Sequence, residues 1–248
     1  MMIQIPEIES DTIIVTFTDC KYLPMFNIWY NYFSRHNLDN LLVVSLDDTA
    51  FKNLQSRNIR TILCEYTILV RDEFWLFRLE TIVNIFTESK KNILHTDADC
   101  IWLKDIYSLI HNQEYDFIAS ISKSHPYHLA QKHGFVMCCG FYYMRYNSKM
   151  LQLVSKILTE DTYGKDDQLR FNYYMFNNVK NILSNTGDLF EKEIELQDNT
   201  KIMVLKKKFV DRTNCNAETY CFHPWLSTPD IVAKINELRT RMKNFANF

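Results

Sequence analysis

Glycine is scarce in this 248-residue sequence, which contains only Gly134, Gly140, Gly164 and Gly187. The glycine-rich motifs GxGxxG, GxxxxGK[ST] and GxSxG are therefore all absent. Their absence argues against a dinucleotide-binding Rossmann enzyme, a P-loop ATPase and an α/β-hydrolase. If this protein binds phosphates, a metal ion and side chains must neutralise their charge, because no glycine-rich loop can do so.

Other features are also missing. None of the seven cysteines forms a CxxC pair, so a zinc ribbon or a redox motif is not expected. No run of 18 apolar residues occurs, and the amino terminus lacks the pattern of a signal peptide. The net charge of -2 gives no general attraction to nucleic acid. We therefore expect a cytoplasmic protein with reduced thiols and no membrane span.

Apolar runs and helical repeats alternate through residues 1–105. Strands are predicted at 13–17, 41–46, 59–63 and 93–97, and helices at 25–33, 49–56 and 72–88. This alternation predicts an α/β fold with a mostly parallel, Rossmann-like central sheet and helices on both faces. Ligands of such sheets bind beyond the carboxyl ends of the strands, so the ends of the first and fourth strands should face one crevice.

Residues 106–248 are less regular. Strands are predicted at 115–121, 140–145, 202–205 and 220–222, and helices at 148–158, 166–176 and 229–242. Neither an internal repeat nor a low-complexity linker is present. We therefore expect a single domain over residues 1–248, with a nucleotide-binding half at 1–105 and a less regular, acceptor-side half at 106–248.

Asp97 and Asp99 form a D-x-D motif within NILHTDADCIWLKD, residues 92–105. Such a motif is expected about once by chance, but this one ends an apolar strand at the expected ligand crevice. Two carboxylates about 4 Å apart repel each other by about 1 to 4 kcal/mol, and a nucleoside diphosphate adds further negative charge. A divalent cation turns these repulsions into attraction, and oxygen ligands suit Mg²⁺ or Mn²⁺. The alternative is a solvated acidic turn.

The stretch D-x-D-x-x-W-L-K-D resembles the DxD region of nucleotide-diphospho-sugar transferases with the GT-A fold. One group of that family has D-x-D-x-x-W-L-[KR]-D-P, and Ile106 stands here at the proline position. The resemblance extends from the first strand to about residue 223. It implies a GT-A-like fold, glycosyltransferase activity, and Mn²⁺ or Mg²⁺ bound by Asp97 and Asp99. Ala98 would then belong to the donor site.

Two more segments of the nucleotide-binding half match the family. IIVTFTD resembles its first strand, whose end contacts the nucleotide at Thr16, Phe17 and Thr18; a plain core strand would give the same pattern. Arg78 lies at the edge of an apolar helix face, where a buried charge needs a partner. The resemblance implies that Arg78 approaches the acidic motif and the diphosphate. The alternative is an arginine on a helix flank with its charge in water.

Two segments of the acceptor-side half match as well. CGFYYMRYN, residues 139–147, resembles a strand that borders the sugar, where Gly140 would admit the substrate; a buried aromatic strand is the alternative. KDDQLRFNYYM resembles a helix start that makes Asp167 and Gln168 catalytic residues. Asp167 would deprotonate the acceptor in an inverting reaction, or stabilise a cationic transition state in a retaining one. It could instead only complement the helix dipole.

His223, in YCFHPWLS, corresponds to a histidine that the family often supplies as a third metal ligand. A neutral imidazole would complete a mixed nitrogen and oxygen donor set for Mn²⁺. Trp225 would stack on the sugar or cap the site. No H-x-x-G pattern follows His223, and a histidine packed in the core is the alternative.

Other classes of protein remain open at this point. In phosphatases of the haloacid-dehalogenase type, Asp97 would be the nucleophile and Asp99 the acid or base, although Ile101 stands where that motif has Thr or Val. A non-catalytic sugar-nucleotide-binding protein would keep the same binding residues. A zinc site at His125, His128 and His133 is not expected, because their spacing matches no common ligand pattern.

We therefore expect a metal-dependent enzyme that transfers a sugar from a nucleotide-diphosphate donor to a hydroxyl of a glycan or other acceptor. We expect UDP in the donor. The sequence does not specify the sugar, the acceptor, the stereochemistry or the oligomeric state.

Overall fold

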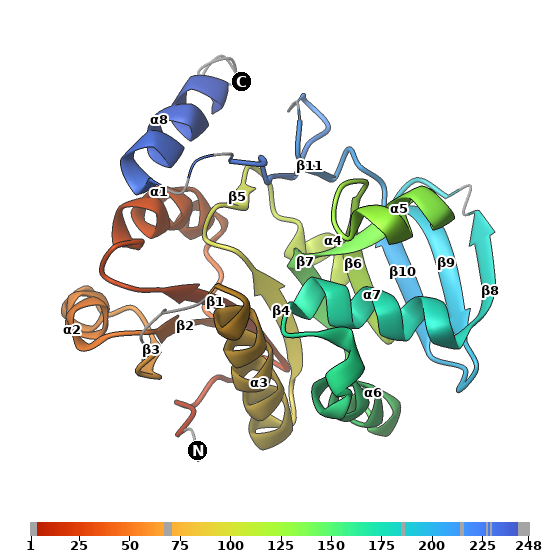
Figure 1. Ribbon diagram of the computed structural model, residues 1–248. Coiled ribbons are helices and arrows are strands. Elements are labelled where there is room, and N and C mark those ends of the chain that lie inside the picture. The colour runs from red at the N-terminus through yellow and green to blue at the C-terminus, as the bar shows by residue number, and fades with distance from the viewer. Residues whose placement is uncertain are drawn as a thin grey trace.

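The computed structural model describes residues 4–66, 71–184, 187–213, 216–226, 228 and 230–242. Its main feature is a nine-stranded sheet with the order β3-β2-β1-β4-β7-β6-β10-β9-β8. Figure 1 shows β3 and β8 at opposite edges of this sheet. The sheet therefore continues from residues 1–105 into residues 106–248.

The first four strands form the regular part of the sheet. They are β1 (Thr12–Thr18), β2 (Leu41–Ser45), β3 (Thr61–Leu63) and β4 (Asn92–Thr96), and their pairings with one another are all parallel. The connections contain α1 (Leu23–Phe33), η1 (Ser34–His36), α2 (Asp48–Ser56) and α3 (Arg71–Ser89). The predicted alternation is thus confirmed here. Parallel pairing places the ends of β1 and β4 at the same edge.

The second half makes the sheet mixed. It contributes β6 (Phe117–Ser122), β7 (Val136–Met144), β8 (Val179–Ser184), β9 (Phe190–Leu196) and β10 (Lys201–Leu205). β7 is antiparallel to both β4 and β6, whereas β10 is parallel to β6. β9 is antiparallel to β10 and β8 is antiparallel to β9. The large sheet is therefore mixed: the strands β1 to β4 pair in parallel with one another, as expected from the sequence, whereas the second half adds mainly antiparallel pairs.

Two hydrophobic cores lie on the two faces of the sheet, as adjacent residues of β1 demonstrate. Ile13 and Val15 pack in one core and Ile14 packs in the other, because successive strand residues point to opposite faces. The first core is covered by α3, α5 (Tyr127–His133), α6 (Ser148–Thr159) and α7 (Asp167–Asn178). The second is covered by α1 and α8 (Ile231–Met242), which lie next to each other in Figure 1. The predicted start of α8 at residue 229 lies outside the described residues.

A small second sheet determines where residue 223 lies. It has the order β11-β12-β5, with β5 at Ile101–Trp102, β11 at Val210–Asp211 and β12 at Cys221–Phe222. β12 runs antiparallel to β5, so that Phe222 lies opposite Ile101. The short helix α4 (Tyr107–Ile110) follows β5. The end of β12 is thereby placed against the loop after β4.

Two sequence-based expectations concern membranes and thiols. Among the described helices, none has both the length and the apolar character that crossing a membrane would require. The cysteines at positions 20, 64, 100, 138, 139 and 221 are free thiols.

Candidate active site

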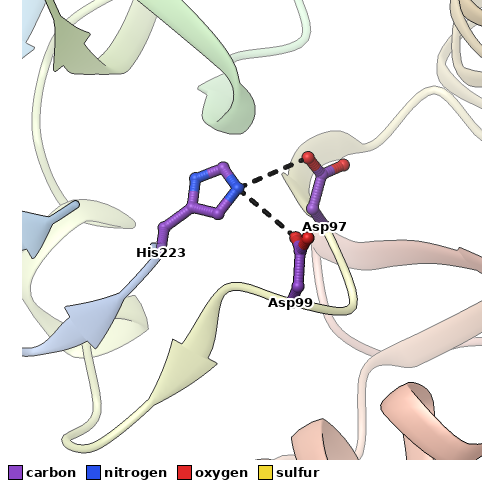
Figure 2. A group of neighbouring side chains, drawn as sticks. All are labelled: Asp97, Asp99 and His223. Carbon is purple, nitrogen blue, oxygen red and sulfur yellow. Dashed lines mark ion pairs between the residues drawn. The ribbon is translucent and has the colours of Figure 1, made fainter. Parts of the chain in front are cut away.

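Three potential metal ligands converge at the carboxyl end of β4. One ligand atom each from Asp97, Asp99 and His223 lies within 4.8 Å of the others. The His223 Nε2 atom is 3.6 Å from Asp97 Oδ2 and 3.4 Å from Asp99 Oδ1. Figure 2 shows the imidazole directed between the two carboxylates. The residues that the sequence assigned to the metal are therefore brought together, across more than a hundred positions of chain.

Gly140 makes this close approach possible. A Cβ atom at this position would lie 2.5 Å from Asp97 Oδ2 and still closer to His223 Cε1. Both distances are far below van der Waals contact, so any side chain here would displace a ligand. The backbone of Gly140 also accepts a hydrogen bond from the Asp97 amide at 2.8 Å. Gly140 thus fixes the space in which the cluster forms.

Arg78 links the acidic motif to α7. Its Nη1 donates to Asp97 Oδ1 at 2.7 Å, and its Nε and Nη2 donate to Asp167 Oδ2 at 2.8 and 2.5 Å. The guanidinium also stacks on Trp75, 4.3 Å from the ring centroid. Arg78 is 4% exposed. It therefore approaches the acidic motif as expected, with its charge directed to two carboxylates.

The pKa values of the two carboxylates that contact Arg78 are shifted in opposite directions. Burial raises the pKa of Asp167 to about 6, although Arg78 opposes this shift. Burial also opposes ionisation of Asp97, but Arg78 and His95 hold the pKa of Asp97 below its usual range. Asp167 therefore loses its proton closer to neutral pH than Asp97 does. Asp97 is available as an anionic ligand over the whole physiological range.

His95 and Tyr22 belong to the site although the sequence analysis did not assign them to it. His95 Nε2 lies 3.2 Å from Asp97 Oδ1, and its Nδ1 lies 3.2 Å from the Val15 carbonyl oxygen. Tyr22 donates its hydroxyl to Asp99 Oδ2 at 3.1 Å. Burial and the neighbouring carboxylates raise the pKa of Tyr22, which keeps it a donor. A histidine inside the apolar strand NILHT is a signal that could have identified His95.

The start of α7 brings the two expected catalytic residues to the site. Asp167 is buried against Arg78. Gln168 accepts a hydrogen bond from the Cys139 amide at 3.1 Å and donates to the His125 carbonyl oxygen. One turn later, Asn172 accepts from the Met137 amide at 2.8 Å. These contacts attach α7 to β7 beside Gly140.

The remaining expected site residues lie around this centre. Thr16, Phe17 and Thr18 are buried at the end of β1, and Phe17 packs edge-on against His95. Ala98 is buried between the two aspartates. Trp225 is 54% exposed, two residues after His223. Their contacts with a substrate stay predictions.

The donor set fits a divalent cation of the Mn²⁺ or Mg²⁺ type. Two carboxylates and one imidazole supply oxygen and nitrogen ligands, which suit these metals. The Asp97 and Asp99 side chains are 26% and 17% exposed, whereas His223 is 7% exposed. The cluster therefore has a buried side and an accessible side, as a site that also binds substrate requires.

Solved structures share this fold at low sequence identity. A mouse xyloside xylosyltransferase 1 matches with a TM-score of 0.54 and 9% identity, over 88% of this chain and 99% of its own. The glycosyltransferase GlyE of Streptococcus pneumoniae matches with a TM-score of 0.50 and 16% identity, over 80% of this chain and 46% of its own. The chain thus spans about half the length of GlyE.

The same fold also occurs in an enzyme with a different printed activity. A CMP:2-keto-3-deoxy-manno-octonic acid synthetase matches with a TM-score of 0.54 and 11% identity, over 95% of this chain and 100% of its own. Likeness of fold therefore does not by itself distinguish sugar transfer from the synthesis of a sugar nucleotide. Among curated protein sequences, none matches this chain.

The sequence itself makes this distinction. The family model described as nucleotide-diphospho-sugar transferase matches residues 36–225, which is more than half of the 248-residue chain. That range contains Arg78, the D-x-D motif, Asp167 and His223. It disfavours the phosphatase alternative, whose motif usually opens the first strand of its domain, whereas here the motif follows the four parallel-paired strands β1 to β4. With its GT-A fold, this chain belongs to the nucleotide-diphospho-sugar transferase family.

Proposed function

We propose that this protein is a metal-dependent glycosyltransferase that moves a sugar from a nucleotide-diphosphate donor to a hydroxyl of a glycan or other acceptor. We propose UDP as the nucleotide, Mn²⁺ or Mg²⁺ as the cofactor, and the cytoplasm as the compartment. The single observation that carries the proposal is the convergence of Asp97, Asp99 and His223 in a chain of this family.

The ligand set defines what a bound cation would contribute. Asp97, Asp99 and His223 would hold the metal, and a metal so placed stabilises the charge of a departing diphosphate as a Lewis acid. Tyr22 donates to Asp99 and His95 contacts Asp97, so that each carboxylate is held by a neighbouring side chain. Such supporting contacts fix the orientation of metal ligands.

Asp167 and Gln168 have roles that follow from their contacts. Two hydrogen bonds from Arg78 hold the Asp167 carboxylate, and it is 3% exposed. These contacts favour stabilisation of positive charge at the sugar over removal of a proton from the acceptor. Gln168 bridges β7 and the segment before α5, and so positions the wall of the sugar site. The division into a nucleotide-binding half and an acceptor-side half remains part of this proposal.

Thermal melting with UDP, GDP and their sugars, each with Mn²⁺ or with EDTA, tests the donor site. A ligand at about 100 times its dissociation constant stabilises the folded state by about 2.7 kcal/mol. We expect a higher melting temperature with one nucleotide, and we expect EDTA to remove the shift. Absence of any shift would contradict the proposed donor site.

Replacement of one metal ligand tests turnover and separates an enzyme from a non-catalytic binding protein. Asp99→Ala should lower metal-dependent kcat/KM by about a thousandfold, because the cation supplies several kcal/mol to the transition state. Asp39→Ala is the matched control and should keep full activity, because Asp39 is exposed and precedes β2, at the opposite end of the parallel strands from the cluster. Unchanged turnover in a folded Asp99→Ala variant would refute the metal assignment, and an inactive unmodified chain that still binds donor would favour the binding protein.

A further inference from the structure

Arg78 is poorly placed to bind the diphosphate of a donor. Its Nη1 is occupied by Asp97, and its Nε and Nη2 are occupied by Asp167. It is also buried beneath the cluster. One positive charge between two negative ones leaves no excess to attract a ligand. A diphosphate would therefore need a second cationic group.

Arg212 is a cationic group on the other side of His223. It follows β11, and the His223 amide donates to the carbonyl oxygen of the preceding Asp211 at 2.9 Å. Its Nη1 donates to the Cys138 sulfur at 2.6 Å, and this sulfur lies 4.0 Å from His223 Nδ1. One sulfur atom thus separates the guanidinium from a metal ligand.

Arg212 differs from Arg78 in its partners. Within the part of the chain that the structure describes, no carboxylate forms an ion pair with Arg212, and its one hydrogen bond goes to Cys138. A guanidinium has five N–H donors. The Arg212 guanidinium also lies 5.7 Å from the ring centroid of Trp225, and the arginine is only partly buried. Several of its donors are consequently available to an incoming anion.

The electric field at this position favours a cation. The charge of Cys138, together with those of Asp99 and Asp97, raises the pKa of Arg212, although burial opposes the shift. The accessible side of the cluster carries Asp97 and Asp99. Because Asp97 and Asp99 act electrostatically on Arg212, an anion bound to a metal on these ligands would lie within electrostatic reach of its guanidinium.

We propose that Arg212 binds the diphosphate of the donor, beside the metal and opposite to Arg78. This inference rests on the proposed function and assigns the diphosphate contact to a different arginine. Arg212 would form charge-assisted hydrogen bonds to phosphate oxygens as the diphosphate departs. A merely structural arginine would instead orient Cys138 and, through it, His223.

Calorimetric titration of four proteins tests this inference: the unmodified chain, Arg212→Gln, Arg212→Lys and the control Arg239→Gln. Arg239 is an exposed arginine of α8. The titrants are UDP and GDP with Mn²⁺, UMP and GMP with Mn²⁺, and Mn²⁺ alone. Melting curves of each variant confirm that it is folded, and Arg212→Lys preserves the charge if Arg212→Gln is unstable.

We expect Arg212→Gln to weaken diphosphate binding by about tenfold to a hundredfold, the range of a hydrogen bond to a charged group. Monophosphate binding should change by less than this, and affinity for Mn²⁺ alone should be unchanged or higher, because a nearby positive charge has been removed. The diphosphate affinity of Arg212→Lys should lie between those of the unmodified chain and Arg212→Gln, since lysine offers charge without the planar guanidinium. The control should match the unmodified chain.

Four results would overturn the inference. Equal losses for monophosphates and diphosphates would show that Arg212 does not discriminate the diphosphate. A matching loss of affinity for Mn²⁺ alone would show that Arg212 acts by positioning His223. Full diphosphate binding in Arg212→Gln would leave the proposed function intact and remove Arg212 from it, whereas failure of the unmodified chain to bind any diphosphate would refute both.

Discussion

The two sides of the Asp97–Asp99–His223 cluster differ in how their charge is balanced. On the inner side, Arg78 is buried and its guanidinium is divided between Asp97 and Asp167. On the outer side, Arg212 is partly exposed and contacts a sulfur atom and an aromatic ring. Both arginines lie near the same ligands, yet among the described residues only the inner one is paired with carboxylates.

This difference indicates that one arginine stabilises the folded site and that the other binds ligand. A buried charge needs partners in the folded protein itself, because water is not available to solvate it. A partly exposed charge is solvated by water, so it does not need a partner within the protein and can pair with a bound ligand. Arg78 should therefore contribute mainly to stability and to the position of Asp97, whereas Arg212 should contribute mainly to binding.

The largest expected effect comes from breaking the inner side. Arg78→Met should lower the free energy of unfolding by about 3 to 5 kcal/mol, because it leaves the Asp97 and Asp167 carboxylates without their cation. Chemical denaturation of both proteins measures the loss. Arg35→Met is the matched control, because Arg35 is exposed and stacks on Tyr32, and it should cost less than about 1 kcal/mol.

A double variant sharpens this test. Asp167→Asn removes one of the charges that Arg78 neutralises, so the combination of both changes should cost less than the sum of the single changes. Strictly additive costs would show that the pair does not interact as described.

An intermediate effect is expected at the boundary between the two sides. Gly140→Ala should weaken Mn²⁺ binding by about tenfold to a hundredfold, because the new methyl group would overlap Asp97 and His223. A metal titration measures the affinity, and a melting curve shows whether the sheet is preserved. Unchanged affinity would mean that the ligands shift without cost, and would remove Gly140 from the requirements of the site.

The smallest expected effect is the change in metal affinity with each unit of pH. Burial and Arg212 lower the pKa of His223, but contacts with Asp99 and Cys138 outweigh them and raise the pKa of His223 well above its usual value. A metal must displace this proton, so the affinity should increase with pH, by up to about tenfold per unit below that pKa. Asp97 stays ionised in this range because its pKa is lowered. Mn²⁺ titrations at pH 6, 7 and 8 measure the slope, and a flat profile would contradict a protonated His223.

The sequence predicted the inner part of the site better than the outer part. Asp97 and Asp99 are close in sequence and end a strand with strong apolar periodicity, so both the fold around them and their placement could be predicted. Asp167 and His223 followed from short motifs of a family that the family model confirms. Tyr22 and Arg212 carry no motif, because their roles arise from distant contacts with Asp99 and Cys138.

The fold shows the same limit. β8 and β9 were not predicted, since FEKEIEL in β9 is mainly charged and the edge strand β8 is largely exposed. Such strands gain their pairing partners from the sheet rather than from their own apolar pattern. The two-residue strands β5 and β11 are too short for any periodicity to identify them, whereas the strand predicted at 220–222 is confirmed as β12.

The three-stranded sheet β11-β12-β5 has a consequence for how the protein matures. His223 reaches the two aspartates only after the chain that follows β10 has returned to β5, a contact between segments far apart in sequence. Closing such a long loop costs entropy before the contact gives any gain. The large sheet can therefore assemble before the cluster is complete, and the ability to capture a cation should be among the last properties that a newly made chain acquires.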